Sequence, residues 1–354
     1  MGLFDNMLGN GDTLIKNEKA LDYEFVPPIV PYRQGQQEQI AACIKPLFAS
    51  RQGRNCMVYG APGIGKTVAV KHLLRELEEQ TDEILPIYIN CWQHNTTYKI
   101  ILELCDQVGY KFTQNKKTVE LMKKAAEIIN KSKAVLVFDE IDKAEDHDFL
   151  YWVIEQLFNK SIILITNYKT WLAEIDERIK SRLTPELLEF KAYNAKEVAG
   201  IIHERIEYAF VTNVWDSVGE KKVAEKTFEI GDIRTGLFLL RESALQAEEK
   251  SSKKVTVEHI DKALAKLDDF TIKSKESLEE DTKMILDTVN NNSGKRIGDL
   301  YKSYKESGGA GSYKTFQRRI AKLDEDKFIS TERTHAGGTS TIVNKKITDF
   351  GDQK

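Results

Sequence analysis

The feature of this 354-residue sequence that most restricts its fold is the run Gly60-Ala-Pro-Gly-Ile-Gly-Lys-Thr67. The run matches the pattern G-x-x-x-x-G-K-[ST] at every fixed position. Its glycines let backbone N–H groups point inward without a Cβ in the way. The loop leads into a helix predicted over 66–80, whose N-terminal dipole favours anions. The run therefore predicts a phosphate-binding loop, in which Lys66 reaches the β- and γ-phosphates and Thr67 binds Mg²⁺.

A second acidic element follows about 70 residues later, in Ala134-Val-Leu-Val-Phe-Asp-Glu140. Five apolar residues place Asp139 at the carboxyl end of a buried strand, beside the loop. We expect Asp139 to hold the metal ion and Glu140 to act as the base that polarises an attacking water. An ordinary strand that ends in a solvated Asp-Glu pair is the alternative.

Three further polar residues are candidates for the same site. Asn167 ends the apolar run 161–166, where it could orient the water or contact the γ-phosphate. Arg182, with Arg178 second, could complete the site of a neighbouring subunit as an arginine finger does; solvated helix charges are the alternative. Arg234 lies just inside a helix start and could swing onto the γ-phosphate.

Short apolar runs alternate with helical periodicity up to about residue 194, which predicts a parallel sheet covered on both faces by helices. Beyond that point helices are predicted, and a polar linker over 271–280 follows them. The predicted strands are 57–59, 84–90, 134–139 and 161–166, and the later helices are 195–210, 217–228, 233–250 and 256–267.

The last segment reads as three helices (281–291, 297–306 and 312–325) and two strands (328–334 and 340–347), the outline of a winged helix. Residues 271–354 carry 16 Lys and Arg against 13 Asp and Glu, whereas the whole chain has a net charge of −3. This tail is therefore the mildly basic end, and DNA binding would come from it locally.

The helix over 312–325 is the candidate recognition helix. Phe316, Ile320 and Leu323 would face the core, and polar residues could enter a groove. The hairpin tip would lie along the minor groove or the backbone. A winged helix used only for protein contacts is the alternative. The candidate DNA-binding residues are Lys314, Gln317, Arg318, Arg333, His335 and Gly337.

Composition limits the remaining classes. Apolar residues make up 41% and charged residues 30%, as in a globular protein with a real core. No apolar run reaches the roughly 18 residues of a membrane span, and the start resembles no signal peptide. The four scattered cysteines suggest buried thiols in a reducing compartment. We expect a cytoplasmic, nucleoid-associated protein with no membrane partner.

Taken in order, these motifs resemble the AAA+ replication initiators of the origin recognition and cell-division-control (Orc/Cdc) family, archaeal type. Further stretches carry the resemblance: Tyr88-Ile-Asn-Cys-Trp with Thr97-Tyr-Lys, Arg178-Ile-Lys-Ser-Arg-Leu183, and Gly231-Asp-Ile-Arg-Thr-Gly-Leu-Phe-Leu-Leu-Arg241. Two positions depart from the family pattern: Tyr32 stands where histidine is common, and Ala192 where proline usually precedes the tyrosine.

The resemblance implies an α/β AAA+ P-loop NTPase with an α-helical lid and a C-terminal winged helix. It also implies that Tyr193 and Arg205 contact the nucleotide, that Val26-Pro-Pro with Tyr32-Arg33 lies beside the adenine, and that an inserted segment near 92–105 touches DNA. The residues expected to bind ATP or ADP are Gly60, Ala61, Pro62, Gly63, Ile64, Gly65, Lys66, Thr67, Val68, Tyr193, Arg205 and Arg234.

The expected organisation is an N-terminal tail (1–24), an ATP-binding base (25–194), a lid (195–270) and a winged helix (271–354). The expected function is an ATP-dependent initiator, a weak ATPase that binds origin duplex DNA and helps load the replicative helicase, with copies of itself or paralogues as further partners. Two alternatives stay open: a clamp-loader or helicase-loader ATPase, and an ATP-binding regulator without origin activity.

Overall fold

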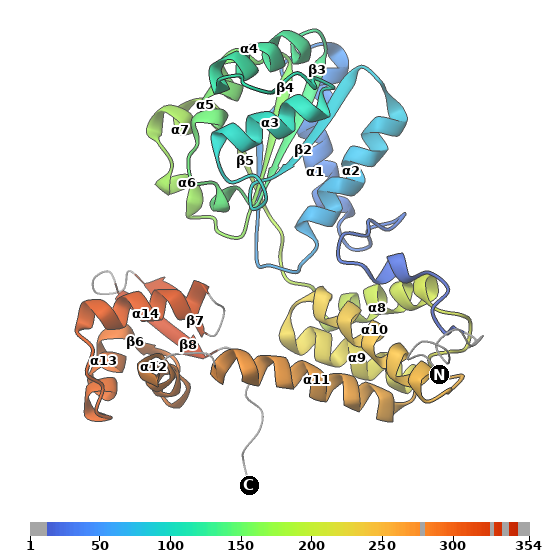
Figure 1. Ribbon diagram of the computed structural model, residues 1–354, viewed down its shortest axis with the longest axis vertical. Helices are drawn as coiled ribbons and strands as arrows, with labels where there is room; N and C mark the ends of the chain where they lie inside the picture. Colours follow the sequence, from blue (N-terminus) through green and yellow to red (C-terminus); the bar gives the residue numbers. More distant parts are fainter. Residues whose placement is uncertain (1–12, 277–279, 326–328, 335–339, 346–354) are drawn as a thin grey trace. The chain divides into compact units, whose positions relative to one another are not determined.

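The computed structural model describes residues 13–276, 280–325, 329–334 and 340–345. The chain divides into two compact units, Met1–Thr256 and Val257–Lys354, and each is described by itself (Figure 1). Within these described ranges, no helix has the length and apolar character needed to cross a membrane.

The core of the first unit is a five-stranded parallel sheet in the order β2-β3-β4-β1-β5. Four strands lie where apolar runs predicted them, which confirms the parallel sheet. The fifth, β5, was not expected from the sequence. The strands are β1 (Cys56–Tyr59), β2 (Ile84–Asn90), β3 (Lys133–Asp139), β4 (Lys160–Thr166) and β5 (Glu186–Glu189).

Helices cover both faces of this sheet. On one face, residues such as Leu136, Phe138 and Leu164 join a core cluster with the helices that follow β2 and β3. Side chains alternate along a strand, so Val135 and Val137 point to the other face, and they are also fully buried. The helices of this base are α1 (Gln34–Ile44), α2 (Lys66–Gln80), α3 (Thr97–Gln107), α4 (Thr118–Ile129), α5 (Asp148–Gln156), α6 (Trp171–Glu174) and α7 (Glu177–Leu183).

The register of the sheet brings the predicted site residues to one edge. Tyr59 of β1 pairs with Thr166 of β4, and β3 pairs with β4 so that Phe138 lies beside Leu164. Because the strands are parallel, Asp139, the last residue of β3, lies at the same edge as the glycine loop and Asn167, which follow β1 and β4. This is the edge at which ligands bind in open α/β sheets.

Three helices complete the first unit: α8 (Ala195–Ala209), α9 (Ser217–Ile230) and α10 (Ile233–Glu249). Each begins at an N-cap whose side chain accepts a backbone N–H: Asn194, Asp216 and Asp232. The segment before α1 packs on this bundle. Ala20 and Leu21 are buried there, and Lys16 N donates to Ala209 O at 2.8 Å.

The second unit has the elements predicted for the tail. Its core joins ten buried residues, among them Phe316, Ile320 and Leu323, which confirms the predicted core face of α14. Helix α11 continues to Glu276, so the linker expected from Thr271 is helical over its first residues. The elements are α11 (Val257–Glu276), α12 (Glu280–Asn291), β6 (Lys295–Arg296), α13 (Ile297–Glu306), α14 (Tyr313–Glu325), β7 (Ile329–Thr334) and β8 (Ser340–Lys345), with sheet order β6-β8-β7.

Candidate functional site

The glycine loop joins β1 to α2 in a conformation that requires glycine. Gly60 has φ 148°, and a β-carbon there would lie 2.3 Å from the carbonyl oxygen of Phe190. Gly65 has φ 85°, and a β-carbon there would lie 2.7 Å from the Tyr193 hydroxyl. The loop ends at Lys66, the first residue of α2. Its backbone N–H groups and the helix start therefore form a site suited to an anion.

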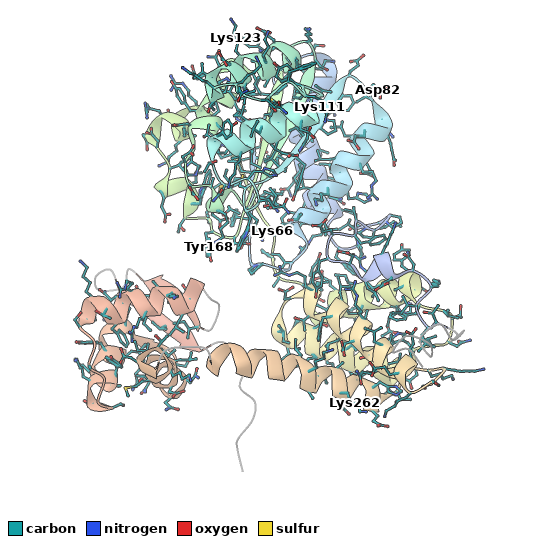
Figure 2. The ribbon with its side chains drawn as sticks, viewed as in Figure 1. Lys66, Asp82, Lys111, Lys123, Tyr168 and Lys262 are labelled. Carbon is teal, nitrogen blue, oxygen red and sulfur yellow. The ribbon has the colours of Figure 1, made fainter. Side chains whose placement is uncertain are left out.

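The ammonium group of Lys66 is held at the edge of the sheet. Its Nζ donates to the carbonyl oxygens of Gly60 and Ala61, each at 2.8 Å, and to Oδ1 of Asn167 at 2.9 Å. Lys66 and Tyr168, the residue after Asn167, lie at the same end of the sheet (Figure 2). Burial lowers the pKa of Lys66 to about 8, although the charges of Glu140 and Asp139 act to raise it.

The carboxylate of Asp139 is buried and accepts hydrogen bonds on both oxygens. Thr67 Oγ1 donates to Oδ2 at 2.7 Å, Tyr88 OH donates to the same oxygen at 2.6 Å, and the backbone N of Glu140 donates to Oδ1 at 2.8 Å. A hydroxyl and a carboxylate are the oxygen donors that Mg²⁺ prefers in phosphate sites. The two predicted metal ligands, Thr67 and Asp139, therefore lie together and fit that ion.

Asn167 connects Lys66, predicted to reach the β- and γ-phosphates, with Glu140, predicted to polarise the attacking water. Its Nδ2 donates to Glu140 Oε2 at 3.2 Å, while its Oδ1 accepts from Lys66. Burial, followed by the charges of Asp139 and Asp142, raises the pKa of Glu140. Glu140 itself adopts φ 53° where the strand ends. The carboxylate, amide and ammonium thus form one continuous chain of contacts.

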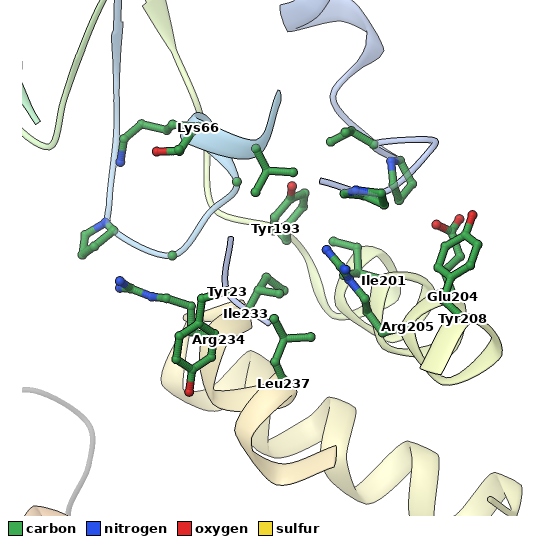
Figure 3. A pocket seen from close by; sticks show the side chains of 18 of the residues that line it. Tyr23, Lys66, Tyr193, Ile201, Glu204, Arg205, Tyr208, Ile233, Arg234 and Leu237 are labelled. Carbon is green, nitrogen blue, oxygen red and sulfur yellow. The ribbon is translucent and has the colours of Figure 1, made fainter. Parts of the chain in front are cut away.

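These residues form one wall of a cavity of about 250 Å³. Arg234 reaches from the start of α10 toward the loop that carries Lys66, and residues of α8 close the other side (Figure 3). Apolar residues of the segment before α1, including Pro27, Val30 and Pro31, complete it. The predicted site residues that line the cavity are Pro62, Gly63, Gly65, Lys66, Thr67, Val68, Glu140, Asn167, Tyr193, Arg205 and Arg234.

The start of α10 touches the glycine loop directly. Ile233 N donates to Gly63 O at 3.2 Å, and a β-carbon at Gly63 would lie 2.1 Å from Asp232 Oδ1. Arg234 forms a two-pronged ion pair with Asp232, with Nη2 2.6 Å from Oδ2 and Nε 3.0 Å from Oδ1. Arg234 therefore lines the cavity and is held in place by Asp232, whose carboxylate lies against the glycine loop.

Arg205 and Arg33 attach other segments to the site. Arg205 Nη1 donates to Ala20 O at 3.0 Å, so this predicted nucleotide contact also fastens the N-terminal segment. Arg33 is buried, and its guanidinium lies 3.9 Å from the centre of the Tyr193 ring. Its Nη2 donates to Ile64 O at 2.9 Å. Arg33 was expected only as part of a segment beside the adenine, and its hydrogen bond to the glycine loop was not expected.

Arg182 does not line this cavity. Its Nε lies 2.7 Å from Glu155 Oε1, and its guanidinium lies over the ring of Tyr151. Arg178, the second candidate, pairs with Asp176 at 2.8 Å. The fold of a single chain therefore does not bring either arginine to Lys66.

The candidate DNA-binding residues are described only in part. Lys314, Gln317 and Arg318 are exposed on α14, whereas Arg319 of the same helix pairs with Asp281. Arg333 lies on β7, and its side chain is outside the described set. His335 and Gly337 lie outside the described residues altogether.

Tyr88 is a site residue that the sequence did not reveal. The sequence places it only in a family-specific stretch, without a role in the site. A signal was present: Tyr88 pairs with Val137, two residues before Asp139, and alternate residues of a strand share a face. Burial, together with the charge of Asp139, raises the pKa of Tyr88, so the phenol keeps its proton and donates.

Comparison with known proteins matches two parts of the first unit and the start of α11 to family models. Residues 50–171 match an AAA domain, and residues 199–265 match a Cdc6 AAA+ ATPase-type lid domain. The ORC1-type DNA replication protein 1 of Archaeoglobus fulgidus is 32% identical over 345 residues, covering 91% of this chain and 84% of that protein. The ORC1-type DNA replication protein 2 of Methanothermobacter thermautotrophicus is 26% identical over 360 residues, covering 96% and 93%.

Solved structures agree in fold. The ORC1 protein of Aeropyrum pernix, solved in complex with DNA, superposes with a TM-score of 0.69 at 24% identity and covers 95% of this chain and 94% of its own. The ORC2 protein of the same organism, solved as ADPNP–ADP complexes, gives a TM-score of 0.72 at 16% identity and covers 94% of each chain. Together with the sheet described above, these matches establish an AAA+ base followed by a helical lid.

Proposed function

The chain belongs to the archaeal Orc/Cdc family of ORC1-type DNA replication proteins, AAA+ ATPases that initiate replication, and from this premise we propose that it is an ATP-controlled switch that binds origin duplex DNA. The observation that carries the proposal is the contact between the start of α10 and the glycine loop. Ile233 N donates to Gly63 O in the same cavity that Lys66 and Arg234 line. A nucleotide in this cavity therefore changes how the lid meets the base.

Each site residue takes a distinct role. Lys66 and the loop bind the β- and γ-phosphates, and Tyr193, Arg205 and Arg234 contact the nucleotide from the lid side. Thr67 and Asp139 hold Mg²⁺, which when bound offsets phosphate charge.

Glu140 accepts a proton from a water that Asn167 orients. That water's oxygen bonds to the γ-phosphorus as the bond to the bridging oxygen breaks. Arg182, paired with Glu155 in the single chain, acts on the site of a neighbouring copy. Hydrolysis is slow, and its role is to reset the switch.

The second unit binds the DNA. In this proposal residues 1–24 are an N-terminal segment, 25–194 the base, 195–270 the lid and 271–354 a winged helix. The exposed Lys314, Gln317 and Arg318 of α14 face the duplex, with the hairpin around Arg333 alongside. An ORC1 protein of the same fold has been solved with DNA. Bound at an origin, the protein helps to load the replicative helicase, alone or beside paralogues.

Lys66→Ala tests the nucleotide half of the proposal. We expect ATP affinity to fall at least about 100-fold, roughly 2.8 kcal/mol, because a buried ammonium at the phosphates is lost. Titration with a fluorescent ATP analogue measures it. Lys124→Ala is the control, since Lys124 pairs with Glu127 on the surface of α4.

Footprinting on the source genome tests the DNA half. The wild-type protein with ATP should protect a defined site, and Lys66→Ala should lose the dependence of that protection on ATP. If no site were protected with or without ATP, the origin-binding role would be wrong. If Lys66→Ala bound ATP normally, the nucleotide site would be wrong.

A further inference from the structure

The carboxylate of Asp139 is fixed more firmly than a metal ligand alone requires. A carboxylate offers about four lone-pair positions, and three of them accept hydrogen bonds from Glu140 N, Thr67 Oγ1 and Tyr88 OH. Asp139 is only 2% exposed. Its orientation is therefore set by the chain before any ligand binds.

The three donors differ in what ligand binding does to them. Thr67 is itself a proposed Mg²⁺ ligand, so its hydroxyl oxygen would face the metal once nucleotide and Mg²⁺ are bound. The Glu140 N–H belongs to the neighbouring residue and holds only Oδ1. Tyr88 then remains as the one donor of these three that fixes Oδ2, the oxygen on the Thr67 side of the carboxylate.

Tyr88 is itself held in place at three points. Its ring lies under Lys71 of α2, with Nζ 4.5 Å from the ring centre. On the outer side of β2, which is an edge strand, neither the backbone N–H nor the carbonyl of Tyr88 has a partner among the described strands. There the side chain of Gln107, the last residue of α3, takes both groups: Oε1 accepts from Tyr88 N at 3.1 Å, and Nε2 donates to Tyr88 O at 2.7 Å.

We propose that Tyr88 is a positioning residue of the nucleotide site, whose hydroxyl holds Oδ2 of Asp139 in the orientation that Mg²⁺ with bound nucleotide requires. The inference rests on the proposed function and deepens it, since it adds a residue from β2 to a site built from the loop, β3 and β4. Tyr88 is not among the residues that line the cavity. Its effect passes through Asp139, as that of an outer-shell partner does.

The test separates the metal from the nucleotide. Binding of a fluorescent ATP analogue is titrated against free Mg²⁺ and repeated with EDTA, for the wild type, Tyr88→Phe and Tyr110→Phe. The Mg²⁺ midpoint is the free Mg²⁺ concentration that gives half of the full rise in binding of the ATP analogue. Tyr88→Phe should raise this midpoint about tenfold, since loss of an outer-shell partner costs about 10–100-fold in metal affinity. With EDTA, its nucleotide affinity should stay within about twofold of the wild type.

Tyr110→Phe is the control, because Tyr110 is a partly buried tyrosine that packs against the core cluster of the sheet. None of the hydrogen bonds described for Asp139 involves Tyr110. This variant should leave the Mg²⁺ midpoint unchanged. In ATPase assays, Tyr88→Phe should raise the KM for Mg²⁺ while kcat at saturating Mg²⁺ approaches the wild-type value. A residue that served only the stability of the sheet would lower affinity equally with Mg²⁺ and with EDTA.

The outcomes distinguish two failures. A wild-type protein that binds no ATP overturns the proposed function itself. The other failure concerns only Tyr88. It is shown if the wild type binds ATP with a clear Mg²⁺ dependence and Tyr88→Phe has the same or a lower Mg²⁺ midpoint. An equal loss with Mg²⁺ and with EDTA also overturns the role of Tyr88.

Discussion

One carboxylate, that of Asp232, lies between the lid and the phosphate loop. It caps α10 by accepting from Arg234 N at 2.9 Å, pairs with the Arg234 guanidinium, and lies against Gly63. In the proposed site, a bound γ-phosphate would compete with this carboxylate for Arg234 and would be repelled by its charge. Asp232 would therefore act against tight ATP binding while it supports the helix.

Asp232→Asn separates these two effects, because asparagine caps a helix about as well as aspartate. We expect ATP affinity to rise about threefold, near 0.7 kcal/mol, as suits the loss of a partly exposed ion pair. ADP affinity should change less. Fluorescence titration of both nucleotides measures the difference. Asp216→Asn, which alters the cap of α9, is the control, and an unchanged or weaker ATP affinity in Asp232→Asn would contradict the argument.

Single residues were predictable where the chemistry is local. Lys66 and Thr67 are fixed by an eight-residue pattern, and Asp139 by the apolar strand before it. The hydrogen bond of Tyr88 to Asp139 and the contacts of Arg33 with the loop region were not predicted, because each residue acts on a partner far along the chain. Tyr88 bonds Asp139, 51 positions away, and Arg33 bonds Lys191, 158 positions away. Local periodicity carries no information on such pairs.

At the scale of elements, Gln107 joins α3 to the edge of the sheet. Gln107→Ala leaves both outer backbone groups of Tyr88 to water, and we expect a loss of about 1 kcal/mol in the free energy of unfolding. Because Tyr88 holds Asp139, the Mg²⁺ midpoint for ATP binding should rise as well. Thermal melting and the Mg²⁺ titration measure the two effects.

Gln107→Glu is a second variant for that prediction. Glutamate keeps the acceptor for Tyr88 N, loses the donor for Tyr88 O and places a carboxylate beside Glu103, so the free energy of unfolding should fall at least as far as in Gln107→Ala. If both variants matched the wild type in melting and in Mg²⁺ midpoint, the contact between α3 and β2 would carry no energetic weight.

Elements with a strong apolar signal were predicted, and those without it were missed. The strands β3 and β4 are buried along nearly their whole length, and their sequences read as continuous apolar runs. In β5 three of four residues are exposed and only Leu188 is buried, so no pattern marked the strand. The polar composition beyond Thr271 predicted a linker, whereas α11 continues to Glu276, and the lysine and glutamate there are good helix formers.

At the scale of the whole molecule, the order of the parts followed from changes in periodicity. Strands stop near residue 194, helices follow, and a hairpin closes the chain. The proposed DNA-binding surface was harder to derive from the sequence, because exposed charges follow no period. On α14 the neighbours Arg318 and Arg319 look alike in the sequence, yet Arg319 pairs with Asp281 and Arg318 is exposed.

Because Arg318 is exposed and Arg319 is paired with Asp281, we expect Arg318 to be the arginine of this pair that contacts DNA. Arg318→Ala should weaken duplex binding about tenfold at low salt, and the slope of log affinity against log salt should shrink by about 1, as for one lost phosphate contact. Anisotropy titrations over a salt series measure both. Lys302→Ala removes one positive charge from the exposed face of α13 and is the matched control.

The control variant distinguishes a direct contact of Arg318 with DNA from an effect of the net charge of the second unit. If Lys302→Ala changed affinity and slope as much as Arg318→Ala, the net charge of the second unit would explain binding, and α14 would have no special place in it. If only Arg318→Ala acts, α14 meets the duplex. The tightening of DNA binding by ATP should then equal the tightening of ATP binding by DNA, because coupling between two sites is reciprocal. Arg318→Ala should lower DNA affinity in the presence and absence of ATP by the same factor, since the residue contacts DNA and not the switch.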